Sequence, residues 1–226
     1  MKKLLTVLSV VILACTSCIM QVGNGKTVHC TGPIFNQNYD SLGVFNAVVV
    51  NGNSNLHITQ AETCGVNVTA NEEVFQYLNY RIEDGVLIIT TKDHVNIRAE
   101  KYDVYVKAPF LTKIGVNGAA DVDQNNAYVS DTPLTVTING AGDLRFNDIK
   151  VSELSITVNG AGDIIASSLD VQTLSVSVNG AGDAKLSGQA QSAYFSVNGA
   201  GDIDARGLEC ENVSVHKAGI ASIQLK

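Results

Sequence analysis

Polar and apolar residues alternate strictly along four short stretches in the second half of the chain. Residues 134–139 read Leu-Thr-Val-Thr-Ile-Asn, and the same alternation recurs at residues 154–159, 174–179 and 193–198. A period of two with many β-branched residues predicts a strand with one buried face. A shorter apolar alternation follows each stretch, as at Leu144 and Phe146, and predicts a second strand on another side of the molecule.

One pentapeptide, Asn-Gly-Ala-Gly-Asp, separates the two strands of each repeat. It occurs at Asn139–Asp143, Asn159–Asp163, Asn179–Asp183 and Asn198–Asp202, with a variant at Asn117–Asp121 and a worn copy at His216–Ile220. Successive copies start 22, 20, 20, 19 and 18 residues apart. A fixed period of this size is typical of stacked repeats. We therefore predict an all-β, single-chain β-solenoid (β-helix) of ~20-residue coils with an N-terminal β-hairpin cap.

The composition of the pentapeptide indicates a sharp corner between two sheets. Glycine supplies positive φ and close backbone approach, and asparagine can bond to its own copy one coil away. The aspartates allow two interpretations: each carboxylate accepts backbone N–H groups of its own corner, or the ladder shares a cation. We predict a structural role, without metal, for these corner residues: Asn139, Asp143, Asn159, Asp163, Asn179, Asp183, Asn198 and Asp202.

The polar side of the first strand in each repeat carries an array of serine and threonine. Such an array suits a solvated sheet face, and it would equally form a flat contact surface for a glycan or another protein. Aromatic residues on an exposed face would favour a glycan, and only Tyr128 and Tyr194 lie within the repeats.

The part before the regular repeats reads as a cap built from less regular strands. Residues 44–50 and 56–59 resemble a degenerate first coil, and Asp84-Gly85 between two strand-like runs predicts a hairpin. Further strands are expected at 65–70 and 102–107, with a short helix possible around 71–78. We assign 40–226 to one solenoid domain, with an irregular capping part at 40–116 and regular repeats at 117–226.

The first residues predict export and lipid attachment. Lys2 and Lys3 precede an apolar run of eleven residues, too short to span a bilayer but suited to a secretory signal. The run ends in small residues and cysteine, which resembles a bacterial lipoprotein signal. We predict a signal peptide at 1–17, lipidation of Cys18 with Cys15 as the alternative, and a tether at 18–39.

Three cysteines remain outside this leader. Cys64 lies near the first predicted coil and Cys210 near the last, and at about 4.8 Å per coil they are too far apart for a disulfide. Cys30–Cys64 is then the one geometrically open pair, and Cys210 is predicted to be a buried thiol.

Charge and motif content exclude several functions. The formal net charge is −7 and no basic stripe is present, so we expect no nucleic-acid partner. No zinc-ligand pair outside the leader, nucleophile elbow or phosphate loop occurs, and the acids recur in every repeat, whereas a catalytic pair occurs once. The prediction is therefore a protein without catalytic residues and without a cofactor.

Several segments resemble the Bacteroidetes envelope family of putative auto-transporter adhesins with a head GIN domain. The resemblance covers about residues 40–226 and rests on Phe45–Gly52, Leu78–Ile89, Val104–Ile114 and the serial Gly-x-Gly-Asp corners. It implies an all-β solenoid and a function in binding, and it brings no catalytic residues with it. Asp40-Ser41-Leu42 is similar to the O-glycosylation sequon of that phylum, which makes Ser41 a candidate modification site.

These features lead to one preferred function and two alternatives. The preferred one is a non-enzymatic outer-membrane lipoprotein, anchored by its lipid alone, that binds an unknown glycan or protein, with a homo-oligomer as an option. The first alternative is a periplasmic structural or envelope-stress lipoprotein without external ligand, which the lack of acidic residues in Ile19–Gly23 favours. The second is a polysaccharide-active β-helix enzyme.

Overall fold

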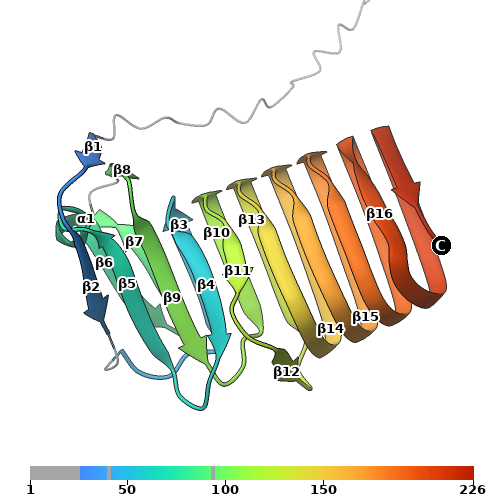
Figure 1. The fold of residues 1–226 in the computed structure, drawn as a ribbon, viewed down its shortest axis with the longest axis horizontal. Helices are drawn as coiled ribbons and strands as arrows, with labels where there is room; N and C mark the ends of the chain where they lie inside the picture. Colours follow the sequence, from blue (N-terminus) through green and yellow to red (C-terminus); the bar gives the residue numbers. More distant parts are fainter. Residues whose placement is uncertain (1–25, 40–41, 93–94) are drawn as a thin grey trace, which may run out of the picture.

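The computed structural model describes residues 26–39, 42–92 and 95–226 and is almost entirely β-sheet. One large sheet curls around an apolar core, and its strands lie side by side along the longest axis (Figure 1). The prediction of an all-β protein is confirmed. The elements are β1 (Thr27–Cys30), β2 (Ile34–Asn38), β3 (Ala47–Gly52), β4 (Asn55–Gln60), β5 (Gly65–Asn71), α1 (Val74–Tyr77), β6 (Leu78–Glu83), β7 (Val86–Thr91), β8 (Asn96–Ala99), β9 (Tyr102–Ala108), β10 (Lys113–Ala119), β11 (Val122–Gln124), β12 (Tyr128–Ser130), β13 (Leu134–Ala141), β14 (Leu144–Ala161), β15 (Ile164–Ala181) and β16 (Ala184–Gln224).

The repeats pair in parallel, with each corner directly beside the next. Asn139 pairs with Asn159, Asn159 with Asn179 and Asn179 with Asn198, and the glycines and alanines that follow keep the same register. Strands β14 and β15 each run for 18 residues from one corner to the next. The two strands expected in each repeat therefore form one continuous strand, because the segment between them also pairs with the neighbouring repeats.

A bend interrupts each long strand without ending it. Asp148 and Ser168 adopt left-handed φ values of 61° and 54° at this point, and Gly188 has a φ of 122°. In the last of these bends one residue is missing, since Ala166 pairs with Leu186 but Leu169 pairs with Gly188. The shorter bend accounts for the spacing of 19 residues between the last two intact pentapeptides.

The worn copy at the end of the chain lies two residues from its predicted position. A Cβ added to Gly219 would meet the carbonyl oxygen of Gly199, and the Ser222 amide donates to Asp202 at 2.8 Å. Residues 218–222 thus form the corner, 20 residues after the preceding one, and the prediction of His216–Ile220 was wrong. The alignment failed because Ala218 occupies the asparagine position and Ser222 the aspartate position.

The alternation of the sequence becomes the alternation of core and surface. Val136, Ile156, Val176 and Phe195 occupy one inward column and are completely buried. Burying a side chain of this size contributes about 1.5–3 kcal/mol relative to leaving it exposed. Because every repeat adds several such residues, the core is one continuous apolar column along the sheet.

The N-terminal strands extend the same sheet beyond the first repeat. β3 and β4 pair in parallel with β10 and β11, as the degenerate first repeat predicted. Beyond β3 lie β7 and its antiparallel hairpin partner β6, joined at Asp84-Gly85, which confirms the predicted hairpin. Beyond β4 lie β9, β5 and β2, and the short α1 confirms the helix expected near 71–78.

The expected tether contains two strands. β1 pairs in parallel with β8, and β2 pairs antiparallel with β5, so ordered structure begins before Asp40. The tether prediction for 18–39 was therefore wrong for these two segments. Their polar, aperiodic sequence gave no sign of a strand, because both pair with segments far along the chain.

We predict that close backbone approach at the corners, rather than positive φ alone, makes glycine necessary there. Gly52 and Gly160 have similar φ values of 151° and 144°, but a Cβ on Gly160 would lie 1.9 Å from the Gly140 carbonyl oxygen, whereas one on Gly52 meets nothing within 4 Å. Gly52→Ala should lower the free energy of unfolding by about 1–3 kcal/mol, the cost of the backbone conformation. Gly160→Ala should cost at least about 2 kcal/mol more, because two strands must separate. Urea unfolding of both variants measures the difference, and equal losses would contradict this explanation.

Candidate binding surface

The corner asparagines form a continuous ladder of side-chain hydrogen bonds on the outside of the sheet. In each repeat the Nδ2 amide donates to the Oδ1 oxygen of the preceding copy, at 2.8–2.9 Å. The ladder comprises Asn51, Asn117, Asn139, Asn159, Asn179 and Asn198. The predicted bond between copies one repeat apart is confirmed.

The corner aspartates accept hydrogen bonds from the next repeat and not from their own corner. The Oδ1 oxygen of Asp143 accepts the backbone N–H of Asp163, the equivalent residue of the next repeat, at 3.0 Å. Asp163 and Asp183 accept in the same way, at 2.9 and 2.8 Å. The prediction that each carboxylate bonds within its own corner was wrong, because in-register stacking places the backbone N–H of the next corner within hydrogen-bond distance of Oδ1. Each bond therefore ties two repeats together.

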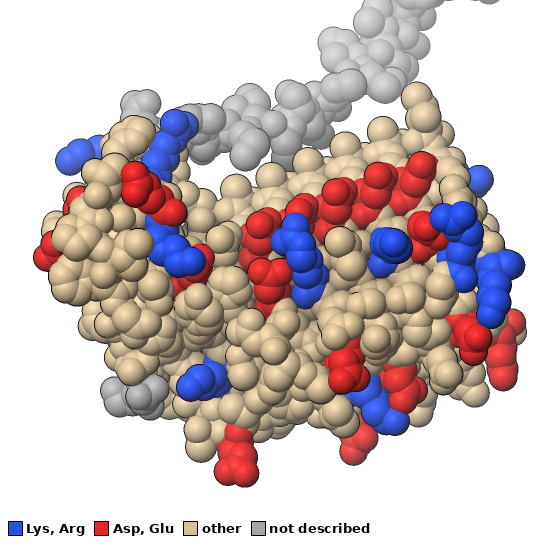
Figure 2. Space-filling model, in the orientation of Figure 1, with Lys and Arg blue, Asp and Glu red and all other residues tan. Residues whose placement is uncertain are grey.

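Basic side chains lie beside this row and partly balance its charge. Arg145 contacts Asp143 at 2.7 Å, and its second nitrogen is 3.9 Å from Asp121 and 3.7 Å from Asp123. Further along, the Arg206 guanidinium holds the pKa of Asp204 well below its ordinary value through direct hydrogen bonds. Figure 2 shows this face, with acidic side chains in a row over the repeats and basic side chains next to them. In the described part of the chain, no group of His, Cys, Asp or Glu is arranged to hold a metal ion.

A polar groove crosses neighbouring repeats in the segment that follows each bend and precedes the strand leading to the next corner. Two adjoining pockets of about 530 and 490 Å³ share Asp170, Val171 and Gln191. Lys150 reaches Asp170 of the next repeat at 2.7 Å, and this hydrogen bond raises the pKa of the lysine. We name this surface the return groove; its lining comprises Val129, Ser130, Asp131, Lys150, Val151, Ser152, Asp170, Val171, Gln172, Gln189, Ala190, Gln191, Glu209, Cys210 and Glu211.

No motif or repeated residue in the sequence marks the return groove. Lys150, Asp170 and Gln189 stack in one column, yet their side chains have different chemistry. A search for repeated residues passes over them for that reason. The available signal was positional, since an exposed polar residue recurs seven residues after Asp143 and Asp163 and six residues after Asp183.

The two tyrosines of the repeats have opposite environments. Tyr128 is buried, its hydroxyl bonds to the Leu111 backbone, and burial raises its pKa. Tyr194 is 43% exposed and lies beside the small hydroxylated residues of the neighbouring repeat, opposite Ser175. Of the two candidates, only Tyr194 can offer its ring to a ligand.

An unrepeated polar cluster joins the cap to the repeats. His57 lies 3.8 Å from Asp103 and 3.7 Å from Asp123, and it stacks on Tyr105 with ring centroids 4.6 Å apart. Asp103 is almost fully buried and contacts Lys101, whose pKa it raises by hydrogen bonding. Lys101, in the turn before β9, pairs with Asp103, and His57 of β4 lies between Asp103 of β9 and Asp123 of β11, an arrangement that links strands.

The cysteines do not follow their predicted roles. Cys30, Cys64 and Cys210 are free thiols, so the open pair Cys30–Cys64 is not formed. Cys30 is buried, and burial together with the nearby Glu73 carboxylate raises its pKa. Cys210 is half-buried, and the prediction of a buried thiol was wrong because its repeat is covered on one side alone.

The predicted modification sites lie outside the described residues. This holds for Cys18, for its alternative Cys15 and for Ser41. No helix that the structure describes has the length and apolar character needed to cross a membrane.

A family model described as "Putative auto-transporter adhesin, head GIN domain" matches residues 44–226. The chain belongs to this family, as the resemblance of its sequence segments indicated. No curated relative matches the chain.

Solved structures of similar fold come from species of Parabacteroides and Bacteroides. A putative adhesin from Parabacteroides merdae is 25% identical, with a TM-score of 0.78 over 89% of this chain and 84% of that one. A putative lipid binding protein from Parabacteroides distasonis is 18% identical, with a TM-score of 0.75 over 89% and 100%. A putative adhesin from Bacteroides fragilis is 17% identical, with a TM-score of 0.70 over 88% and 100%. The last two similarities concern the fold alone.

We expect the aspartate row to need an acceptor oxygen at each position and not a negative charge. Asp163→Asn keeps an oxygen for the Asp183 amide and removes one of the like charges, so stability should rise by about 0.5 kcal/mol at low salt. The gain should shrink at about 1 M salt, where the Debye length is near 3 Å. Asp163→Ala loses the acceptor and should cost about 1 kcal/mol. Urea unfolding at both salt concentrations tests this, and an asparagine variant less stable than the wild type would contradict it.

Proposed function

We propose that this chain is a non-enzymatic lipoprotein of the cell envelope that binds a glycan or a protein through the outer faces of a β-solenoid. The single observation that carries the proposal is the return groove, a polar surface continuous over several repeats. Stacked-repeat proteins commonly use extended surfaces of this kind for binding. The family description and the Parabacteroides merdae adhesin support a role in adhesion.

The proposal of a β-solenoid rests on the register of the repeats. Parallel pairing of each residue with its copy, from β10 and β11 through β16, is the arrangement that successive turns of one solenoid require. The hairpin β6–β7 and the strands β5 and β2 then act as the cap at the N-terminal end.

The chemistry of the surface favours an uncharged or mixed-charge ligand. Lys150, Asp170, Gln172 and Gln191 offer both donors and acceptors, as the hydroxyl groups of a sugar require. The row of aspartates on the neighbouring face would repel an anionic polymer. Tyr194 adds one exposed aromatic ring near the C-terminal end.

The proposed attachment uses residues of the leader. A signal peptide at 1–17 would leave Cys18 as the lipidated first residue, whereas lipidation of the alternative, Cys15, would follow a shorter signal peptide; Ser41 would carry an O-linked glycan. The anchored protein would reside in the outer membrane, facing either the cell surface or the periplasm. A periplasmic protein without external ligand is the second candidate, favoured by the lack of acidic residues in Ile19–Gly23.

Protease digestion of intact cells distinguishes these two locations. A surface-exposed binding protein should be cleaved in intact cells as readily as in lysed ones. A known periplasmic protein must stay protected in the same sample, which shows that the cells are closed. Protection of this chain until lysis would remove the surface adhesin from consideration.

Ligand screening with groove variants tests the binding surface. On a glycan array, Asp170→Ala and Gln191→Ala should each weaken a bound glycan about tenfold, since truncating a central polar contact typically costs more than 1 kcal/mol. Thr135→Ala, an exposed change on another face, is the matched control and should bind normally. Equal binding by all three variants would exclude the return groove as the contact surface.

A further inference from the structure

The last repeat exposes positions that are buried one repeat earlier. Gly219 lies over Gly199, so Val215 and Leu225 correspond to Phe195 and Ala205. The earlier pair is 0% and 2% exposed, whereas Val215 and Leu225 are 47% and 43% exposed. The apolar core therefore reaches the surface at this end, and no described residue covers it.

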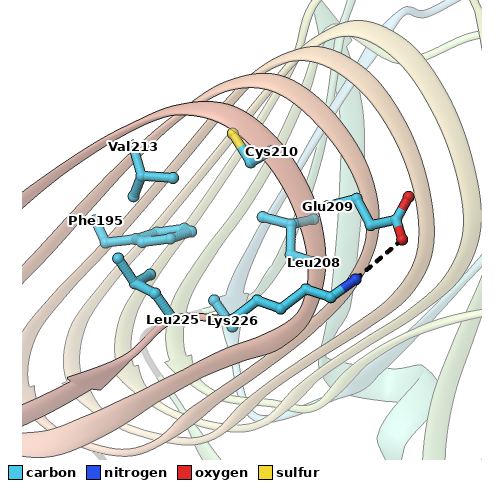
Figure 3. Close-up of a pocket in the computed structure, with 8 residues that line it drawn as sticks. Phe195, Leu208, Glu209, Cys210, Val213, Leu225 and Lys226 are labelled. Carbon is cyan, nitrogen blue, oxygen red and sulfur yellow. Dashed lines mark hydrogen bonds and ion pairs between the residues drawn. The ribbon is translucent and has the colours of Figure 1, made fainter.

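A pocket of about 390 Å³ opens at the same end. Phe195, Val213 and Leu225 form one side of it, and Leu208 and Cys210 approach from the other (Figure 3). Lys226 reaches across to Glu209 at 3.2 Å. The pocket is the open end of the core column, with charges only at its rim.

The edge of the sheet here has no partner strand among the described residues. Residues 212–217 continue β16, and the strand pairs on one side only, with the preceding repeat. Unpaired backbone groups on an edge strand are a template for pairing with another chain. This edge also carries the exposed side chains of Val213 and Val215. A partner strand would therefore both pair with its backbone and cover its apolar surface.

The sequence of this edge is complementary to itself when reversed. Residues 211–217 read Glu-Asn-Val-Ser-Val-His-Lys. In an antiparallel pair centred on Ser214, Val213 faces Val215 of a second copy and Glu211 faces its Lys217. Neither charge has an ion-pair partner within the structure described.

We propose that two copies of this chain form a dimer through residues 211–217, paired antiparallel about a two-fold axis at Ser214. The pairing brings the two open core columns together and buries Val213, Val215 and Leu225 of both copies. Glu211 and Lys217 form two ion pairs, one on each side of the axis. Such an interface uses the same patch on both partners and closes after two copies.

A head-to-tail stack fits the molecule less well. The opposite end carries β2 and β6 as edges, each antiparallel to its neighbour and on separate arms of the sheet (Figure 1). β16 would need one parallel partner that continues the register of the repeats. A head-to-tail contact would also continue into filaments, whereas the two-fold contact ends growth.

Cysteine cross-linking tests the proposed register. In the full chain purified in detergent, with Cys210→Ser to remove the nearby native thiol, Ser214→Cys should give a disulfide-linked dimer under mild oxidation. Directly opposite residues in an antiparallel pair have Cα atoms about 4.5–5.5 Å apart, within the reach of a disulfide. Asn212→Cys is the matched control, because the Cα atoms of the two copies of residue 212 would be about 14 Å apart. A mixture of Asn212→Cys and His216→Cys chains should again cross-link.

Charge reversal tests the same interface without cysteine chemistry. Sedimentation of the full chain in detergent should show a monomer–dimer equilibrium, and Glu211→Lys or Lys217→Glu should each weaken it about tenfold or more through like-charge contacts. The double variant E211K/K217E should return to within about threefold of the wild type, because both pairs are restored in reverse. A wild-type monomer at every concentration, concentration-dependent filaments, or a double variant as weak as the single ones would overturn the proposal. So would a Ser214→Cys chain that cross-links no better than Asn212→Cys.

Discussion

Backbone contact between corner glycines is the constraint on which the rest of the structure depends. A Cβ on Gly140, Gly160 or Gly180 would lie only 1.9–2.0 Å from the carbonyl oxygen of the glycine one repeat earlier, so only hydrogen fits there. The contact allows the chain to turn at the same residue in every repeat. Because the corners coincide, the strands on both sides of them keep one register. Each inward residue therefore stacks on its own copy in the neighbouring repeat.

A shared register makes each exposed side chain the neighbour of its own copy. A primary amide suits this situation, since it carries a donor and an acceptor, and the asparagines form an unbroken ladder. A carboxylate has no donor, and equal charges repel. The aspartates resolve the conflict by accepting a main-chain N–H from the next repeat, as Asp143 does from Asp163. The same stacking that creates the repulsion thus supplies the compensating bond.

Features that repeat, or that a local turn fixes, could be predicted from the sequence. The alternation at 134–139, the corners and the Asp84-Gly85 hairpin are of this kind. Features that depend on distant partners could not. β2 is recognisable only beside β5, and the return groove consists of residues such as Lys150 and Asp170 that share a column without sharing chemistry. The last corner was misplaced because Ala218 and Ser222 have replaced the residues by which the motif is recognised.

Changes in repeat length are confined to one side of the molecule. The shortest repeat lacks a residue at the Gly188 bend. The longest has one extra residue between Asp123 and Tyr128 and another between Ser130 and Leu134, as their pairing with the next repeat shows. The corner never varies in length, so it serves as a spine, while the opposite margin accepts insertions and deletions. Loops could therefore be lengthened or exchanged beside the return groove without disturbing the spine, which makes this margin the natural place to graft new recognition sequences.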